Sequence, residues 1–138
     1  MYNLDFLSRQ HDDITTIIEE IGRYLKPDTL GSSEQAKEVR KWISILAGKL
    51  RVHMQAEDNH LYPKLVNHSE EQIRKVAKVY IEQMGDLASV FSEFNETYRL
   101  YSYIQANSYR FIQDTQKILR LLSERISKEN KNLYVLLR

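Results

Sequence analysis

The 138-residue sequence contains no cysteine, only four glycines and two prolines, and no long hydrophobic run. Without cysteine the chain can form no disulfide, no thiolate metal site and no cysteine nucleophile, which suits a reducing compartment. Few glycines and prolines, together with few valines and threonines, favour long helices over strands and turns. Since no stretch of 18 apolar residues occurs and residues 1–13 lack the apolar core of a signal peptide, we expect a soluble, cytoplasmic protein.

The chain also lacks a large charge of either sign. Its 20 Lys and Arg residues and 19 Asp and Glu residues leave a formal net charge of +1. Such a balance leaves no excess of positive charge that would attract nucleic acid or an anionic membrane, so neither partner is expected. A homodimer or a protein partner is left open. The length suits a single domain over residues 1–138 with a sizeable core.

Apolar residues recur at helical spacing in four segments, which predicts an all-α protein. The first helix is expected from residue 4 to about residue 25, where Pro27 prevents its continuation. A capping box of Ser32 and Gln35 predicts the start of the second helix, which should end at Pro63.

A second capping box, Ser69 with Gln72, predicts the start of the third helix. After a turn near residues 101–108, the fourth helix should run to the end of the chain. The connections are short, which predicts neighbouring helices in opposite directions, as in an antiparallel up-down-up-down four-helix bundle.

The second half of the chain repeats the first. A shift of 72 residues aligns "LRVHMQAEDNHLYPKL" with "LSERISKENKNLYVLL", and the identical positions include Tyr62 with Tyr134. A shift of 73 residues aligns the first helix with the third. The polar positions then correspond as follows: His11 with Met84, His53 with Arg125, and Glu57 with Glu129. The histidines therefore belong to the first half alone.

Three ionisable residues of the second helix interrupt its apolar face. His53, Glu57 and His60 fall within a sector of about 60° at 100° per residue. Imidazole nitrogens and carboxylate oxygens on facing helices are the ligands that hold iron or manganese in bundle cores. The candidate metal ligands are therefore His11, His53, Glu57, Glu129 and His60. Of these, His60 is the least favourable, because two turns of helix separate it from His53 by about 10.8 Å; it would join Glu57 or face solvent.

A metal-free polar network is the alternative to a metal site. Buried histidines are usually hydrogen-bonded and buried carboxylates usually paired, since leaving such groups without a partner costs several kcal/mol. The positively charged Arg125 guanidinium would lie where a second ion would have to bind, and the Met84 thioether is a weak ligand for iron. We therefore expect at most one transition-metal ion. Ligand histidines must be deprotonated at the binding nitrogen, so binding should weaken as the pH falls through roughly 6.5.

An enzyme is a third possibility, but the sequence indicates no catalytic residue and no substrate. It contains no glycine-rich phosphate loop, no nucleophile elbow and no dinucleotide-binding fingerprint. An open ion with bound water could still support redox chemistry. We lean towards a protein that is not an enzyme.

Three segments, "RQHDDI", "HMQAEDNHLYPKL" and "RISKENKNLYVLL", together resemble the hemerythrin-like HHE cation-binding domain over essentially the whole chain. The resemblance implies a four-helix bundle that holds non-haem iron. Relatives carry oxygen, sense oxygen or redox state, handle iron, or act in the repair of nitric-oxide damage. On this basis His11 matches the histidine of the first helix, His53 and Glu57 match the pair on the second, and Glu129 matches the carboxylate of the fourth.

Two positions depart from the family pattern. Met84 stands at the histidine position of the third helix, and Arg125 stands at that of the fourth. A di-iron centre needs ligands for both ions, so the resemblance implies a single-metal or degenerate member that does not bind dioxygen reversibly.

Overall fold

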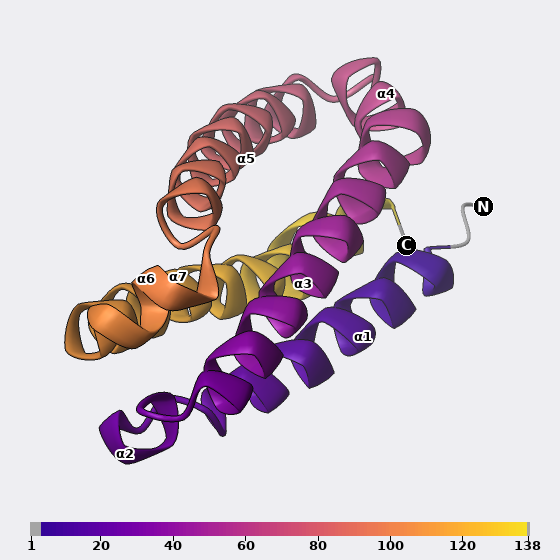
Figure 1. The fold of residues 1–138 in the computed structure, drawn as a ribbon. Coiled ribbons are helices and arrows are strands. Elements are labelled where there is room, and N and C mark those ends of the chain that lie inside the picture. Colours follow the sequence, from indigo (N-terminus) through magenta and orange to yellow (C-terminus); the bar gives the residue numbers. More distant parts are fainter. Residues whose placement is uncertain (1–3, 138) are drawn as a thin grey trace.

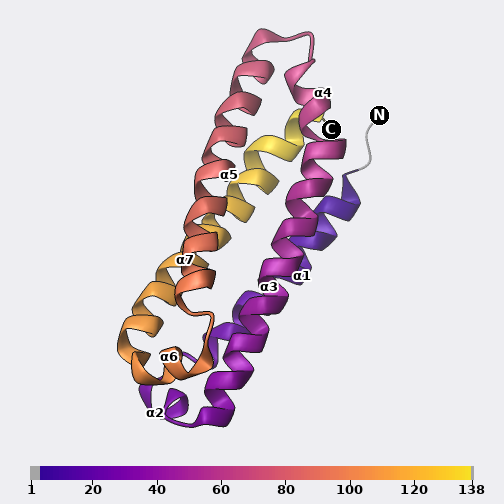
Figure 2. The ribbon, with the colours of Figure 1, turned by 45° about the horizontal axis from the view of Figure 1, so that its top comes forward.

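The computed structural model describes residues 4–137, which form a bundle of four long helices joined by short helical segments (Figures 1 and 2). The long helices are α1 (Asp5–Gly22), α3 (Ser33–His60), α5 (Glu71–Thr97) and α7 (Ser108–Lys128). The connecting helices are α2 (Pro27–Leu30), α4 (Tyr62–Val66) and α6 (Tyr101–Ala106). The chain continues from α7 into the π-helical turn η1 (Glu129–Leu133) and the 3-10 helix η2 (Tyr134–Leu137). No strand occurs within residues 4–137, so the predicted all-α class is confirmed. None of the helices formed by these residues is long and apolar enough to cross a membrane.

One of the two predicted capping boxes is present. The Ser32 hydroxyl accepts a hydrogen bond from the backbone N–H of Gln35 at 3.4 Å, at the start of α3. The prediction for Ser69 was wrong, because α5 begins after Glu70 and has no side-chain cap. The backbone N–H of Glu70, the N-cap residue, donates instead to Nδ1 of His68 at 3.0 Å.

Several helix ends differ from the sequence-based expectation. The first helix ends at Gly22, before the proline that was expected to stop it. Pro27 and Pro63 instead lie in the first turns of α2 and α4, where a missing N–H costs no hydrogen bond. The expected turn near residues 101–108 contains the helix α6, and the last helix is not α-helical to its end.

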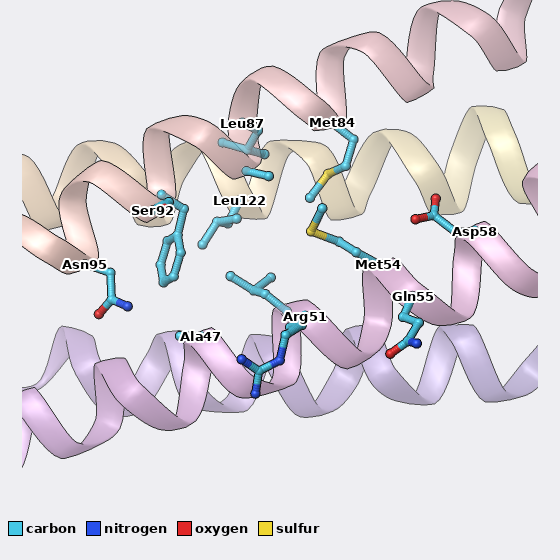
Figure 3. A pocket seen from close by; sticks show the side chains of 13 residues that line it. Ala47, Arg51, Met54, Gln55, Asp58, Met84, Leu87, Ser92, Asn95 and Leu122 are labelled. Carbon is cyan, nitrogen blue, oxygen red and sulfur yellow. The ribbon is translucent and has the colours of Figure 1, made fainter.

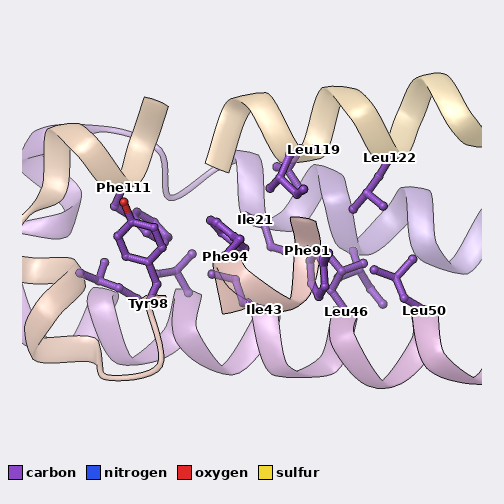
Figure 4. Close-up of a cluster of buried hydrophobic side chains, with 14 of the residues drawn as sticks. Ile21, Ile43, Leu46, Leu50, Phe91, Phe94, Tyr98, Phe111, Leu119 and Leu122 are labelled. Atoms are coloured by element: carbon purple, nitrogen blue, oxygen red, sulfur yellow. The ribbon is translucent and has the colours of Figure 1, made fainter. Parts of the chain in front are cut away.

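Two apolar clusters fill the bundle and show the direction of the helices. The larger cluster joins the end of α1 with the start of α3, the end of α5 and the start of α7; Figure 4 labels Ile21, Ile43, Phe94, Tyr98 and Phe111 among its members. The smaller cluster joins the start of α1 and of α5 with α4 and η2, through residues that include Leu7, Leu65, Ala77 and Leu137. Successive long helices thus contribute opposite ends to each cluster, which is the packing of antiparallel neighbours. The buried ionisable residues lie between the two clusters along the chain.

Candidate metal centre

Four of the five predicted ligands converge in the interior of the bundle. His11 comes from α1, His53 and Glu57 lie one turn apart on α3, and Glu129 begins η1. Each offers one ligand atom, and these four atoms lie within 4.8 Å of one another. All four side chains are buried, with at most 4% of their surface exposed.

His60 does not join this group. It is the last residue of α3 and is exposed, and its ring packs edge-on against Phe6 with 5.5 Å between ring centroids. The two helical turns from His53 carry it beyond the buried donors, towards the end of the helix.

The distances between the four ligand atoms can be compared with the donor-to-donor distances around a single ion. Nε2 of His11 lies 2.8 Å from Oε1 of Glu129, and Nε2 of His53 lies 3.6 Å from the same oxygen and 3.5 Å from Oε2 of Glu57. Donor atoms that share an ion through bonds of about 2.1 Å are about 3.0 to 3.4 Å apart when adjacent. The three contacts lie within about 0.2 Å of that spacing. All four ligand atoms lie within 4.8 Å of one another, so a single ion could bind them after a small contraction of the site.

The outer nitrogens of both histidines face amide oxygens. Nδ1 of His11 lies 2.9 Å from Oδ1 of Asn130, and Nδ1 of His53 lies 2.7 Å from Oε1 of Gln10. An amide oxygen only accepts, so each Nδ1 carries the hydrogen and donates it. This arrangement directs both Nε2 atoms to the centre of the site and fixes the tautomer that a metal requires.

A fifth group, the Tyr134 phenol, also reaches the site. Its hydroxyl donates to Oε2 of Glu57 at 2.8 Å and lies 3.1 Å from Nε2 of His11 and 3.4 Å from Nε2 of His53. The ring stacks on that of His11 with 5.1 Å between centroids. Tyr134 is thus part of the site, although it lay outside the polar face predicted from the sequence.

Comparison with known proteins identifies the family. The family model of the hemerythrin HHE cation binding domain matches residues 3–137. The chain belongs to the hemerythrin HHE cation-binding domain family. No significant similarity was found to a curated protein or to a solved structure. The buried His and Glu cluster of this hemerythrin-family protein could therefore hold a metal ion.

Arg125 fills the other side of the hemerythrin-like core. Its Nε donates to Oε2 of Glu129 at 3.1 Å, and its Nη2 donates to Tyr62 Oη at 3.2 Å and to the Tyr80 carbonyl at 2.8 Å. The guanidinium also lies over the Tyr80 ring, 4.6 Å from its centroid. Arg125 thus takes one oxygen of Glu129 and leaves the other facing the histidines. This is the ion pair that the metal-free alternative expects.

Charges within the cluster move the pKa values of its members in opposite directions. Burial acts to lower the pKa of His53, but hydrogen bonds to Glu129 and Glu57 and the charges of both carboxylates raise it to about 9. Burial acts to raise the pKa of Glu129, yet its hydrogen bonds to His11 and His53 and the charge of Arg125 hold it near 2. Burial raises the pKa of Glu57. Without metal, His53 is therefore an imidazolium between carboxylates.

One buried oxygen of the cluster is unsatisfied. Oε1 of Glu57 has no hydrogen-bond partner among residues 4–137. A buried acceptor without a partner is costly, and the rest of the cluster is paired. A cation that Glu57 bound through both carboxylate oxygens would satisfy this oxygen, and two imidazoles with two carboxylates are a ligand set that suits iron or manganese. The residues present therefore fit one ion.

A cavity runs alongside the centre between α3 and α5. It has a volume of about 490 Å³, and Figure 3 shows Met54 and Met84 pointing towards each other within it. A second cavity of about 200 Å³ shares Met54, Asp58 and Met84 with the first and is lined by Glu57. The smaller cavity thus places open space beside the buried carboxylate of Glu57.

The sequence contained signals for some of the residues that periodicity missed. Tyr134 and Tyr62 occupy equivalent positions of the duplication, and each reaches one side of the core. Gln10 and Asn130 are each adjacent in sequence to a predicted ligand. Nothing in the sequence, however, shows that their amides meet the outer nitrogens of the two histidines.

Proposed function

We propose that this hemerythrin-family protein binds a single iron ion through His11, His53, Glu57 and Glu129. We further propose that it uses the ion to sense oxygen, nitric oxide or redox state, or to handle iron. The observation that carries the proposal is the convergence of four buried donors whose Nε2 atoms both face inwards. The unsatisfied Oε1 of Glu57 supports it, since a polar network complete without metal would leave no such atom.

The restriction to one ion rests on the opposite side of the core. Arg125 places a permanent positive charge against Glu129, and arginine remains protonated at any physiological pH. Met84, buried at the position of the missing histidine, offers iron only a soft thioether. A second cation would face the guanidinium without an imidazole ligand from either residue.

Sensing or iron handling suits this arrangement better than reversible oxygen transport, which in this family needs both ions. A bound iron ion supplies one-electron redox chemistry. The chain contributes the rest: it holds the two imidazoles in the correct tautomer and excludes bulk water through the apolar clusters. The cavities along Met54 and Met84 admit small molecules to the side of Glu57.

Elemental analysis of protein purified without a metal-affinity tag tests the proposal. We expect about one iron per chain, and either two ions or none would contradict it. Exposing the iron-loaded, reduced protein to oxygen or nitric oxide should then change its absorption spectrum. An unchanged spectrum would eliminate gas sensing and leave iron handling.

A metal-free module that supports packing or a protein contact is the second candidate. The ion pair of Arg125 with Glu129 favours it, because it satisfies part of the buried charge without metal. In this case the melting temperature of chelator-stripped protein would not change on addition of iron or manganese at pH 7.5. A clear increase would reject this candidate, because a ligand that binds the native state alone must stabilise it.

A further inference from the structure

We propose that the phenol oxygen of Tyr134 is a fifth protein ligand of the ion, an inference that rests on the proposed function. The oxygen lies 2.8 Å from Oε2 of Glu57, 3.1 Å from Nε2 of His11 and 3.4 Å from Nε2 of His53. The four donors themselves are separated by 2.8, 3.5 and 3.6 Å where they meet. Tyr134 is therefore as close to the donors as they are to one another.

The number of donor atoms that Tyr134 contacts distinguishes a ligand from a residue that braces a ligand. Adjacent donors on one ion with bonds of about 2.1 Å are about 3.0 to 3.4 Å apart, and all three Tyr134 contacts lie close to that range. A bracing residue would contact one donor from outside the shell, as Gln10 and Asn130 do. The Tyr134 oxygen instead contacts inward-facing atoms of three different ligands.

The local backbone holds the phenol in this position. In an α-helix, residues five apart point about 140° away from each other, so Tyr134 would face away from Glu129. The turn η1 is π-helical, and the backbone N–H of Tyr134 donates to the Glu129 carbonyl; this bond from i to i+5 brings the two residues nearer to one face than an α-helix would. Stacking on the His11 ring then fixes the phenol, which is completely buried.

In the metal-free site, burial and the charges of Glu57 and Glu129 raise the pKa of Tyr134, so the phenol stays neutral; a bound cation would shift this balance towards an anionic oxygen. With neutral histidines, the carboxylates of Glu57 and Glu129 balance one guanidinium and only half of a divalent ion. The surplus positive charge is buried, where an unbalanced charge is costly. Binding of Tyr134 as a phenolate, with release of its proton to solvent, cancels this surplus. With a ferric ion, it removes one of two surplus charges.

Ferric iron loading of matched tyrosine variants tests the assignment. The wild-type protein should show the visible charge-transfer absorption of a ferric phenolate. Tyr134→Phe keeps the ring that stacks on His11, and it should still bind one iron but lose the band, with affinity lowered about tenfold or more. Tyr62→Phe is the control, since Tyr62 is buried five residues after Glu57 and its hydroxyl contacts Arg125; it should keep the band.

The outcomes separate this inference from the proposed function. Wild-type protein that binds one iron without a phenolate band would overturn the Tyr134 assignment and leave the proposed function intact, as would a Tyr134→Phe variant that retains the band. Wild-type protein that binds no iron would refute both. If Tyr134→Phe does not fold, resonance Raman spectra of the wild type decide: phenolate vibrations that persist in Tyr62→Phe support the assignment, and their absence overturns it.

Discussion

The two halves of the bundle have the same construction but satisfy their buried charges differently. Around His53, which belongs to the first half, the hydroxyl of Tyr134 from the second half lies 3.4 Å from Nε2. Around Arg125, which belongs to the second half, the hydroxyl of Tyr62 from the first half lies 3.2 Å from Nη2. Since His53 and Arg125 occupy equivalent positions of the duplication, each tyrosine of one half reaches the key residue of the other.

The difference between the halves lies in the group that faces each buried carboxylate. Arg125 supplies a charge that is covalently attached and always present, and it donates to Glu129, Tyr62 and the Tyr80 carbonyl. Nε2 of His53 lies near two carboxylates and a phenol, and the His11 ring is 4.5 Å from the His53 ring between centroids. One half therefore carries its own cation, and the other brings together buried imidazoles and carboxylates that could hold one.

Removing His53 should have the largest effect. We expect His53→Ala to reduce the iron content from about one ion per chain to near zero, because it deletes one of two imidazole ligands. The measurement is elemental analysis after loading and desalting. His60→Ala, on the same helix but exposed, is the matched control and should retain the ion. Equal iron content in both variants would contradict the assigned site.

Replacing Arg125 tests the opposite half. Arg125→Leu leaves a buried carboxylate oxygen of Glu129 without this donor, so the metal-free protein should lose about 3 to 5 kcal/mol of unfolding free energy. With metal bound the loss should be smaller, because the ion balances part of the carboxylate charge. Urea denaturation measures both values. Arg120→Leu, at an exposed position of α7, should change stability by no more than about 0.5 kcal/mol.

As the pH rises, the stability of the metal-free protein should decrease, whereas the increase in melting temperature on adding metal should grow. The folded pKa of His53, about 9, lies above its unfolded value of 6.5, so its contribution to metal-free stability is complete below 6.5 and is lost as the pH rises through 9. That loss is at most about 3 kcal/mol. Metal must displace the Nε2 proton, so the increase in melting temperature on adding metal should grow over the same interval.

Calorimetry at several pH values, with and without metal, measures this dependence. The interval lies above the value of roughly 6.5 expected from an unperturbed histidine. At the acid end, the folded pKa of Glu129 is about 2 against 4.5 unfolded, so its contribution is present above 4.5 and is lost as the pH falls towards 2. A metal-free melting temperature that rises between pH 6.5 and 9 would contradict the imidazolium assignment.

The smallest effect concerns the helix starts of the two halves. Ser32 caps α3, whereas Ser69 makes no cap for α5. We expect Ser32→Ala to cost about 0.5 to 1 kcal/mol, and Ser69→Ala to change stability by less than about 0.5 kcal/mol. Thermal unfolding of the two variants side by side measures the difference. Equal losses would show that the hydroxyl of Ser69 has a role that the structure does not reveal.

The sequence by itself determined the helical class and the inward face of each long helix. Apolar residues at helical spacing place side chains on a face without any knowledge of the neighbours, because the α-helix repeats every 3.6 residues. The same repeat predicted that His11, His53, Glu57 and Glu129 point inwards, and all four are buried. The duplication then identified Met84 and Arg125 as the positions where the halves differ.

The tertiary structure alone decided which polar groups meet. Periodicity assumes a regular α-helix. The π-helical turn η1 changes the direction in which every later side chain points, which is why Tyr134 enters the site although the sequence did not predict it. Periodicity also predicts the direction in which a side chain points around the helix axis, but not its position along the bundle. It therefore placed His60 on the correct face without showing that the helix ends there. Contacts of Gln10, Asn130 and Arg125 depend on how separate helices pack, and a periodic pattern within one helix contains no information about that distance.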